Sequence, residues 1–215
     1  MELNLPTLTT AVLVSIGAVI SAPVLYKGFA RRGKGVLYEK NFLIQRAPQY
    51  STLLNVILIA AAHLANNGVI SGFDPALLCQ ARLLPAPFGE AVQWGGVAIL
   101  VSGLIFMVGG WISLAECFTT DAEVLDGHKV RRNGLLGLVM HPAYSGIIQS
   151  VLGSGLASGS FVCAAFTLAV VAPLWLNRAK YEESILIENL GPEYKQYGEE
   201  MKWRRLVPKF IPIGI

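Results

Sequence analysis

Long apolar runs without charge, separated by short charged segments, restrict the fold of this chain more than any other feature. The runs lie at about Leu8–Tyr26, Tyr50–Ile70, Ala91–Phe118, Gly134–Leu156 and Phe161–Asn177. Each is close to the ~20 residues that cross ~30 Å of hydrocarbon. Charged residues are only 14% of the 215 residues, against about 25% in soluble domains. The sequence therefore predicts an all-α integral membrane protein with about five transmembrane helices.

The distribution of lysine and arginine predicts the orientation of these helices. All Lys and Arg residues except Arg82 fall in Lys27–Gln49, in Thr119–Asn133 or in the tail that starts at Arg178. With five spans, these three blocks lie on one side of the membrane, and basic segments favour the cytosol. We expect an external N-terminus and a cytosolic C-terminus, in the endoplasmic reticulum of a eukaryote or the inner membrane of a prokaryote. The net charge of +3 then reflects orientation rather than nucleic-acid binding.

The tail after the fifth run is charged, but it carries apolar residues at helical spacing. Arg178–Asn189 is typical of an amphipathic helix, and Gly191 and Pro192 are suited to end it and to begin another. We expect this cytosolic helical tail to lie along the membrane surface or over the spans. Cys79, Cys117 and Cys163 are far apart, and their spacing supports no metal site.

The fourth run contains "GLVMHPAYSG", in which a histidine, a proline and a tyrosine interrupt an apolar segment. His141 is expected seven residues into the span, roughly 10 Å below its start, with Tyr144 on the same face. Polar groups at such a depth normally face a cavity or the bundle interior. The alternative is a kinked helix whose His and Tyr bond to neighbouring helices.

Two charged segments flank this run. Arg178 and Glu182 are four residues apart and project from one helical face, with Glu183 beside them. In the loop Phe118–Gly134, the segment His128–Val130 comes close to the start of the fourth span. The alternative interpretations are a solvated surface ion pair of little energetic worth and a solvated loop.

The order of these motifs resembles that of the isoprenylcysteine carboxyl methyltransferase family and the related phospholipid N-methyltransferases. It runs from "HKV" through "HPAYSG" to Arg-x-x-x-Glu-Glu and "GPEYKQY", within Phe118–Pro208. The resemblance implies that S-adenosylmethionine binds in a cavity between the last two spans, the preceding loop and the following helix. A lipid-like acceptor would enter from the bilayer. The chain is then one membrane domain, residues 1–215, with three helices in 8–118 and a cofactor-binding catalytic half in 119–215.

The resemblance also implies roles for individual residues. Arg178 and Glu182 are the expected catalytic residues, and no metal is expected. The residues expected to bind the cofactor are His128, Lys129, Val130, Gly134, His141, Tyr144, Glu183, Tyr194 and Tyr197. The chain departs from the family pattern at Met140, where an arginine is usual, and at Leu135–Leu138. Both departures concern how the carboxylate of the cofactor is held, and Arg131 or Arg132 could substitute.

The predicted function is methyl transfer from S-adenosylmethionine to a lipid-like acceptor, foremost the carboxylate of a prenylated cysteine. A carboxylate is already nucleophilic, and Arg178 could orient it through two parallel bonds. An amine would need a base, for which Glu182 is the candidate, so a phospholipid amine N-methyltransferase is the first alternative. The others are a sterol-reductase-like enzyme that uses a nicotinamide cofactor and a membrane protein without enzymatic activity. Membrane lipids are the other expected partners.

Overall fold

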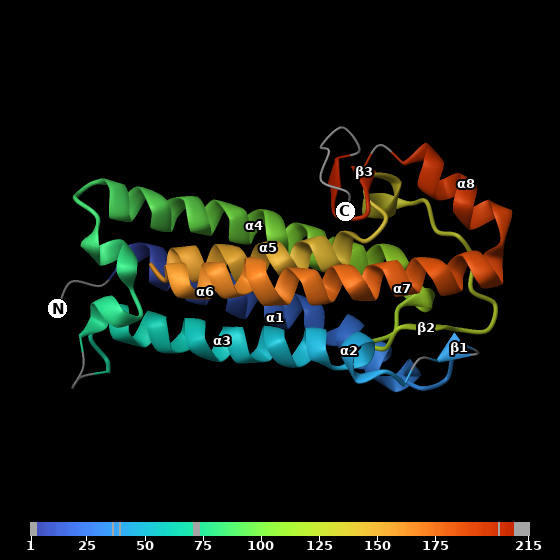
Figure 1. Ribbon diagram of the computed structural model, residues 1–215, viewed down its shortest axis with the longest axis horizontal. Helices are drawn as coiled ribbons and strands as arrows, with labels where there is room; N and C mark the ends of the chain where they lie inside the picture. Colours follow the sequence, from blue (N-terminus) through green and yellow to red (C-terminus); the bar gives the residue numbers. More distant parts are fainter. Residues whose placement is uncertain (1–3, 36, 39, 71–73, 202, 209–215) are drawn as a thin grey trace. The chain divides into compact units, whose positions relative to one another are not determined.

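The structure is a computed structural model that describes residues 4–35, 37–38, 40–70, 74–201 and 203–208 (Figure 1). The α-helices are α1 (Leu5–Arg31), α2 (Phe42–Gln45), α3 (Ala47–Asn66), α4 (Phe88–Leu114), α5 (Pro142–Ala157), α6 (Phe161–Phe166), α7 (Ala172–Leu190) and α8 (Pro192–Glu200). Short strands form two antiparallel pairs, β1 (Leu37–Tyr38) with β2 (Glu123–Val124), and β3 (Trp203–Arg204) with β4 (Val207–Pro208). The prediction of an all-α protein is confirmed.

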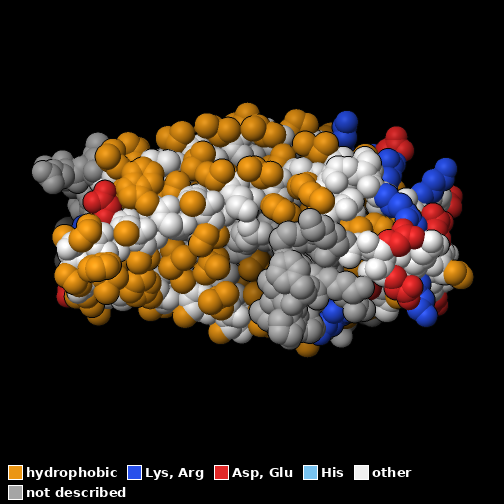
Figure 2. Space-filling view, turned by 90° about the horizontal axis from the view of Figure 1, so that it is seen from above, with side chains coloured by type: hydrophobic (Ala, Val, Ile, Leu, Met, Phe, Trp, Pro, Cys, Tyr) orange, Lys and Arg blue, Asp and Glu red, His pale blue; other side chains and the backbone are white. Residues whose placement is uncertain are grey.

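Three helical segments of the described chain are long and apolar enough to cross a membrane. They are Leu5–Arg31, Phe88–Cys117 and Phe161–Leu190. Large apolar side chains stay exposed along them, including Val19, Ile105 and Leu168, and Figure 2 shows apolar side chains over much of one face. Such a surface suits contact with lipid and indicates an integral membrane protein.

The fourth predicted span begins later than the sequence suggested, so its predicted start at Gly134 is wrong. Gly134–Gly137 is a 3-10 turn, and Gly134 has φ +59°, which favours glycine. The α-helix begins at Pro142, the position where proline fits best because its missing N–H would be unpaired anyway. Helix α5 has 16 residues and α3 has 20, and five spans remain a prediction.

The fifth predicted span and the amphipathic segment after it form one continuous helical segment. The predicted helix at Arg178–Asn189 is confirmed as part of α7. A π-helical turn, Thr167–Val171, joins α6 to α7. Within it the Ala172 N–H donates to the Thr167 carbonyl, just ahead of Pro173, which has no N–H to donate. The wider turn lets the helix pass the proline without a break. The predicted stop is confirmed at Leu190, with Gly191 at φ +62° and Pro192 starting α8.

The described residues divide into two compact units. Unit 1 takes its residues from Met1–Val19, Gln49–Leu104 and Ile148–Pro173, and unit 2 takes its residues from Ile20–Pro48, Ile105–Ile147 and Leu174–Ile215. Unit 2 thus gathers all three basic blocks of the sequence, whereas Arg82 belongs to unit 1. Every candidate site residue also belongs to unit 2.

In unit 1, helices α4 and α5 approach each other closely because glycines lie at the contact. A Cβ atom on Gly96 would lie 2.4 Å from the Ala157 nitrogen, and one on Gly103 would lie 2.4 Å from the Ser150 nitrogen. In both helices the two contacts are seven residues apart, which keeps them on one face. Small residues at such positions let helix backbones pack in a membrane.

In unit 2, an apolar core supports the start of α5. Trp111, Phe118 and Ala143 are buried together, and Tyr144 packs against them. Helix α5 is therefore fixed at its first turn by contacts with the end of α4 and with the loop that follows. This arrangement determines where His141 and Tyr144 lie.

Candidate functional site

His141 lies immediately before α5, not inside a helix as the sequence suggested. Its carbonyl accepts the Ser145 N–H at 3.1 Å, and its own N–H donates to the Arg205 carbonyl at 3.2 Å. The imidazole is 8% exposed and stacks on the Tyr144 ring, with centroids 5.4 Å apart and planes 3° apart. Pro142, which interrupts the apolar run, starts the helix that carries Tyr144 and follows His141.

Helix α7 brings its charged residues to the same place. Arg178 Nε donates to the Tyr144 hydroxyl at 3.0 Å and to Glu182 Oε1 at 3.2 Å. The Tyr144 hydroxyl in turn donates to Glu182. Arg178 and Glu182 meet because residues four apart share a helix face. The phenol, the guanidinium and the carboxylate form one bonded group.

Glu183 completes the arrangement on the other side of His141. Its Oε1 atom lies 3.4 Å from His141 Nε2 and accepts a hydrogen bond from Arg205 Nε at 2.7 Å. Glu182 Oε2 lies 3.9 Å from His141 Nδ1. We call His141, Tyr144, Arg178, Glu182, Glu183 and Arg205 the carboxylate cluster. The histidine and the acidic pair that the sequence predicted in one site do lie together.

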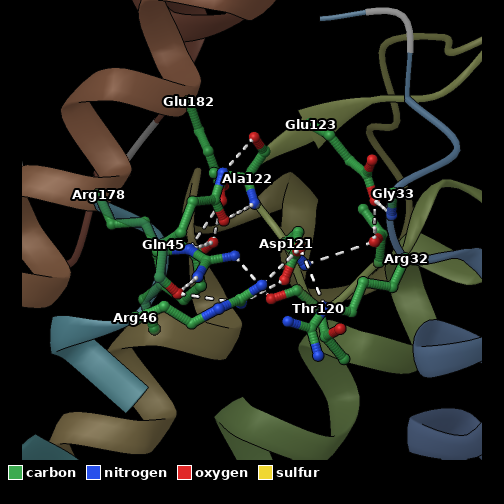
Figure 3. A network of polar contacts seen from close by, with 12 residues as sticks. Arg32, Gly33, Gln45, Arg46, Thr120, Asp121, Ala122, Glu123, Arg178 and Glu182 are labelled. Carbon is green, nitrogen blue, oxygen red and sulfur yellow. Dashed lines mark hydrogen bonds and ion pairs between the residues drawn. The ribbon is translucent and has the colours of Figure 1, made fainter. Parts of the chain in front are cut away.

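Arg178 is held more completely than an exposed ion pair would be. Its side chain is 2% exposed, and its Nη1 and Nη2 atoms donate to the carbonyls of Gln45 at 3.4 Å and Thr120 at 2.9 Å. Figure 3 shows the guanidinium among these groups. A charge buried this way is tolerated only with several partners, so the solvated-surface alternative for this pair is wrong.

The loop that contains Thr120 is also held by ion pairs and hydrogen bonds of Asp121 and Glu123 (Figure 3). Asp121, whose side chain is 1% exposed, pairs with Arg46 at 2.8 Å and with Arg32 at 3.1 Å. Burial acts to raise the pKa of Asp121, but the two guanidinium groups outweigh it and lower that pKa below its usual value. Glu123 accepts the N–H groups of Gly33 at 3.0 Å and Gly35 at 2.8 Å. The loop is thus fixed rather than merely solvated.

The tail tyrosines are buried against the segment before α5. Tyr194 and Tyr197 form an apolar cluster with Met140 and Met201, and the Tyr197 hydroxyl donates to the Leu136 carbonyl at 2.5 Å. Burial raises the pKa of both phenols. The apolar Met140, which stands where the family has an arginine, packs in this cluster and is 7% exposed.

The loop residues predicted to bind the cofactor have different environments. His128 is half-buried, which lowers its pKa, while the Glu182 charge acts in the opposite direction. Val130 packs against the Met140–Tyr197 cluster, and Lys129 is exposed. Gly134 serves the turn: a Cβ there would lie 2.4 Å from Ser113 Oγ. Among these residues, His128 is close enough to the carboxylate cluster for the charge of Glu182 to act on it.

Sequence reasoning missed two residues of this site. Gln45 binds Ala122 from 77 residues away, and Arg205 binds Glu183 from the tail. A polar glutamine between apolar segments was a usable signal for Gln45. Arg205 had none beyond its charge, because neighbouring tail positions are also basic. Among the described residues, no group of three His, Cys, Asp or Glu could hold a metal ion.

Part of the chain is similar to a known family of proteins. Residues 96–188 match the isoprenylcysteine carboxyl methyltransferase (ICMT) family. The chain is 30% identical over 86 residues to the protein-S-isoprenylcysteine O-methyltransferase of Schizosaccharomyces pombe, covering 40% of this chain and 34% of that protein. It is 26% identical over 113 residues to probable protein-S-isoprenylcysteine O-methyltransferases of two Oryza sativa subspecies, covering 51% of this chain and 59% of theirs. The chain thus spans between a third and three fifths of these relatives, and the predicted resemblance is confirmed over the matched region.

Proposed function

We propose that this protein transfers a methyl group from S-adenosylmethionine to the carboxylate of a prenylated cysteine or a similar lipid-like acceptor. One observation carries the proposal: His141, directly before α5, and Tyr144 of α5 meet Glu182 and Glu183 of α7 in a single cluster. The match to the isoprenylcysteine family covers both helices. Its relatives are named as O-methyltransferases, which favours oxygen rather than nitrogen as the accepting atom.

The residues of the carboxylate cluster fit the charged groups of this cofactor. Glu182 and Glu183 are 18% and 13% exposed, so their oxygens are reachable and can accept from an ammonium group. The cofactor supplies the electrophilic methyl group when bound. The chain itself aligns the reactants and excludes water, which an in-line displacement chiefly needs.

The pairing of charges in the cluster favours an acceptor that is already ionised. An amine acceptor must lose a proton to a nearby base. Glu182 is bonded to both Arg178 and Tyr144, and Glu183 is bonded to Arg205. Both carboxylates are therefore already engaged with groups of the protein rather than free to take up that proton. A carboxylate acceptor needs no base at all, so the cluster suits carboxyl methylation better than amine methylation.

The position of the site within the chain supports a cytosolic cofactor entry. Unit 2 contains the three basic blocks together with the whole carboxylate cluster. Basic segments of membrane proteins favour the cytosolic side, which is where a water-soluble cofactor is supplied. The expected orientation therefore has unit 2 at the cytosolic face and the C-terminus in the cytosol.

A methyl-transfer assay with radiolabelled S-adenosylmethionine tests the proposal. The purified protein is offered a synthetic farnesylcysteine in one arm and a phospholipid extract in the other. We expect label in farnesylcysteine that alkali releases as methanol, because a methyl ester is hydrolysed and an N-methyl group is not. Alkali-stable label in the phospholipid would instead establish the amine methyltransferase. Absence of cofactor binding, with tight NADPH binding, would establish the reductase alternative.

Matched variants link any activity to the cluster. Glu182→Gln removes a charge from the cluster, whereas Glu188→Gln removes an exposed charge from the same helix. The first variant should lose most of the transfer and the second should keep it. Equal activity in both variants would contradict a role of the cluster in the reaction.

A further inference from the structure

Arg205 makes fewer side-chain hydrogen bonds within the protein than Arg178, the other arginine of the carboxylate cluster. Within the described residues, its one side-chain partner is Glu183, bonded through Nε at 2.7 Å. Arg178, by contrast, uses Nε and both terminal nitrogens and is 2% exposed. The Arg205 side chain is 19% exposed. Its terminal nitrogens therefore remain available to a ligand.

The backbone of Arg205 is fixed beside the first turn of α5. Arg205 and Leu206 form the two-residue turn between β3 and β4. Their carbonyls accept from the His141 N–H at 3.2 Å and from the Ser145 hydroxyl at 3.3 Å. Arg205 has φ +48°, a left-handed conformation that costs a non-glycine residue about 1 kcal/mol or more. Two-residue hairpin turns commonly require such a conformation, and it fixes the backbone of Arg205 at this position.

The other arginines near position 140 have different partners. Arg131 pairs with Glu116 at 3.8 Å, and Arg132 pairs with Glu200 and lies over the Tyr197 ring. Met140 itself is buried among apolar residues. Neither loop arginine, therefore, supplies the cation that the family pattern has directly before His141. The Arg205 backbone is bonded to His141, and its guanidinium is bonded to Glu183, which faces the His141 imidazole.

We propose that Arg205 binds the carboxylate of the methionine part of the cofactor, in place of the arginine that Met140 replaces. The inference rests on the proposed function, because it takes S-adenosylmethionine as the ligand. A guanidinium can hold a carboxylate through two parallel N–H bonds, and Arg205 can offer such a pair while its Nε stays on Glu183. Glu183 then keeps the guanidinium in place and balances its charge before the cofactor binds.

Binding measurements with two ligands test this assignment without measuring catalysis. S-adenosylmethionine and its decarboxylated analogue differ only by the carboxylate. Wild-type protein should bind the former at least about tenfold more tightly, as expected for a charge-assisted contact. In Arg205→Gln the ratio of the two affinities should fall to about one, through loss of affinity for S-adenosylmethionine alone. Arg132→Gln, a matched change of a partly exposed arginine, should keep the wild-type ratio.

The other outcomes overturn either the inference or the function beneath it. An unchanged ratio in Arg205→Gln, or an equal loss for both ligands, would show that Arg205 acts only through Glu183. If wild-type protein binds S-adenosylmethionine and the decarboxylated analogue equally well, no residue of the protein binds the carboxylate. If wild type binds neither compound, the proposed function itself fails. Should Arg205→Gln not fold, Arg205→Lys serves instead: it cannot make the two parallel bonds, so its ratio should fall severalfold, and an unchanged ratio would refute the inference.

Discussion

Gln45 and Ala122 exchange two hydrogen bonds, from the Gln45 amide nitrogen to the Ala122 carbonyl and from the Ala122 N–H to the amide oxygen, each 2.9 Å long. One side chain thereby satisfies both backbone groups of a buried residue, much as a neighbouring strand would. The backbone of Gln45 also accepts from Arg178. The end of α2 and the loop after α4 are joined through this one glutamine and the guanidinium of Arg178.

Gln45→Ala should destabilise the protein by about 1–3 kcal/mol, because it leaves the buried N–H and C=O of Ala122 without partners. Thermal unfolding in detergent would measure the loss. Gln196→Ala removes a glutamine from an exposed contact with Glu200 and should change stability by less than about 0.5 kcal/mol. If both variants unfold at the same temperature, the paired bonds of Gln45 contribute nothing.

Glu183→Gln should weaken the binding of S-adenosylmethionine by about tenfold or more while the protein stays folded. The variant keeps the shape of the side chain but removes the charge that faces His141 and Arg205, and such charge-assisted contacts are the stronger kind. Equilibrium dialysis with labelled cofactor measures the affinity, and size-exclusion chromatography reports the folded fraction. Normal affinity in Glu183→Gln would remove this residue from the binding site.

Asp121→Asn should destabilise the protein at neutral pH, and the difference from wild type should shrink in acid. Arg46 and Arg32 hold the pKa of Asp121 below its ordinary value despite its burial. The carboxylate therefore contributes its full stabilisation above the unfolded-state pKa of about 3.9, and this is lost as the pH falls through the lower folded-state pKa. Unfolding temperatures of both proteins between pH 7 and pH 3 test the sign. A difference that grows in acid would contradict it.

Gly103→Ala and Gly95→Ala, both in α4, should have opposite effects. A Cβ on Gly103 would lie 2.4 Å from the Ser150 nitrogen, whereas a Cβ on Gly95 meets nothing within 4 Å. The first change should destabilise by about 1–3 kcal/mol, since helix backbones must move apart. The second should stabilise by about 0.5–1 kcal/mol, because alanine favours the helix. The unfolding temperatures of the two variants give the comparison. If both substitutions destabilise the protein, the close contact between α4 and α5 at Gly103 does not explain the effect.

Features set by residues close together in the sequence were easier to predict than contacts between residues far apart in it. The residue types alone left a kinked helix and a surface ion pair as alternatives, and the family resemblance was needed to expect His141, Tyr144, Glu182 and Glu183 in one site. The stop at Gly191 and Pro192 was predicted because both residues act through their own backbone. Local signals of this kind can be read from a single chain.

The start of α5 was predicted wrongly because proline can occur either inside a helix or at its first position, with opposite effects. Inside one it removes a bond, and at the first position it fits. The 3-10 turn at Gly134–Gly137 and the packing of Ala143 place Pro142 at the first position of α5, and neither feature can be recognised in the sequence. The bonds of Gln45 and Arg205 were not predictable for another reason: their partners lie 77 and 22 residues away, and no local pattern encodes such pairs.

The turn at Arg205 and Leu206 also bears on the order in which the protein is completed. Helices α5 and α7 are synthesised well before the carbonyls that accept from His141 and Ser145. A nascent chain that has reached only α8 therefore holds an unsatisfied His141 N–H and a Glu183 without its guanidinium. The groups that bond to the His141 N–H and to Glu183 thus follow the histidine by about sixty residues, so premature termination before this turn should leave an inserted protein with an incomplete cluster.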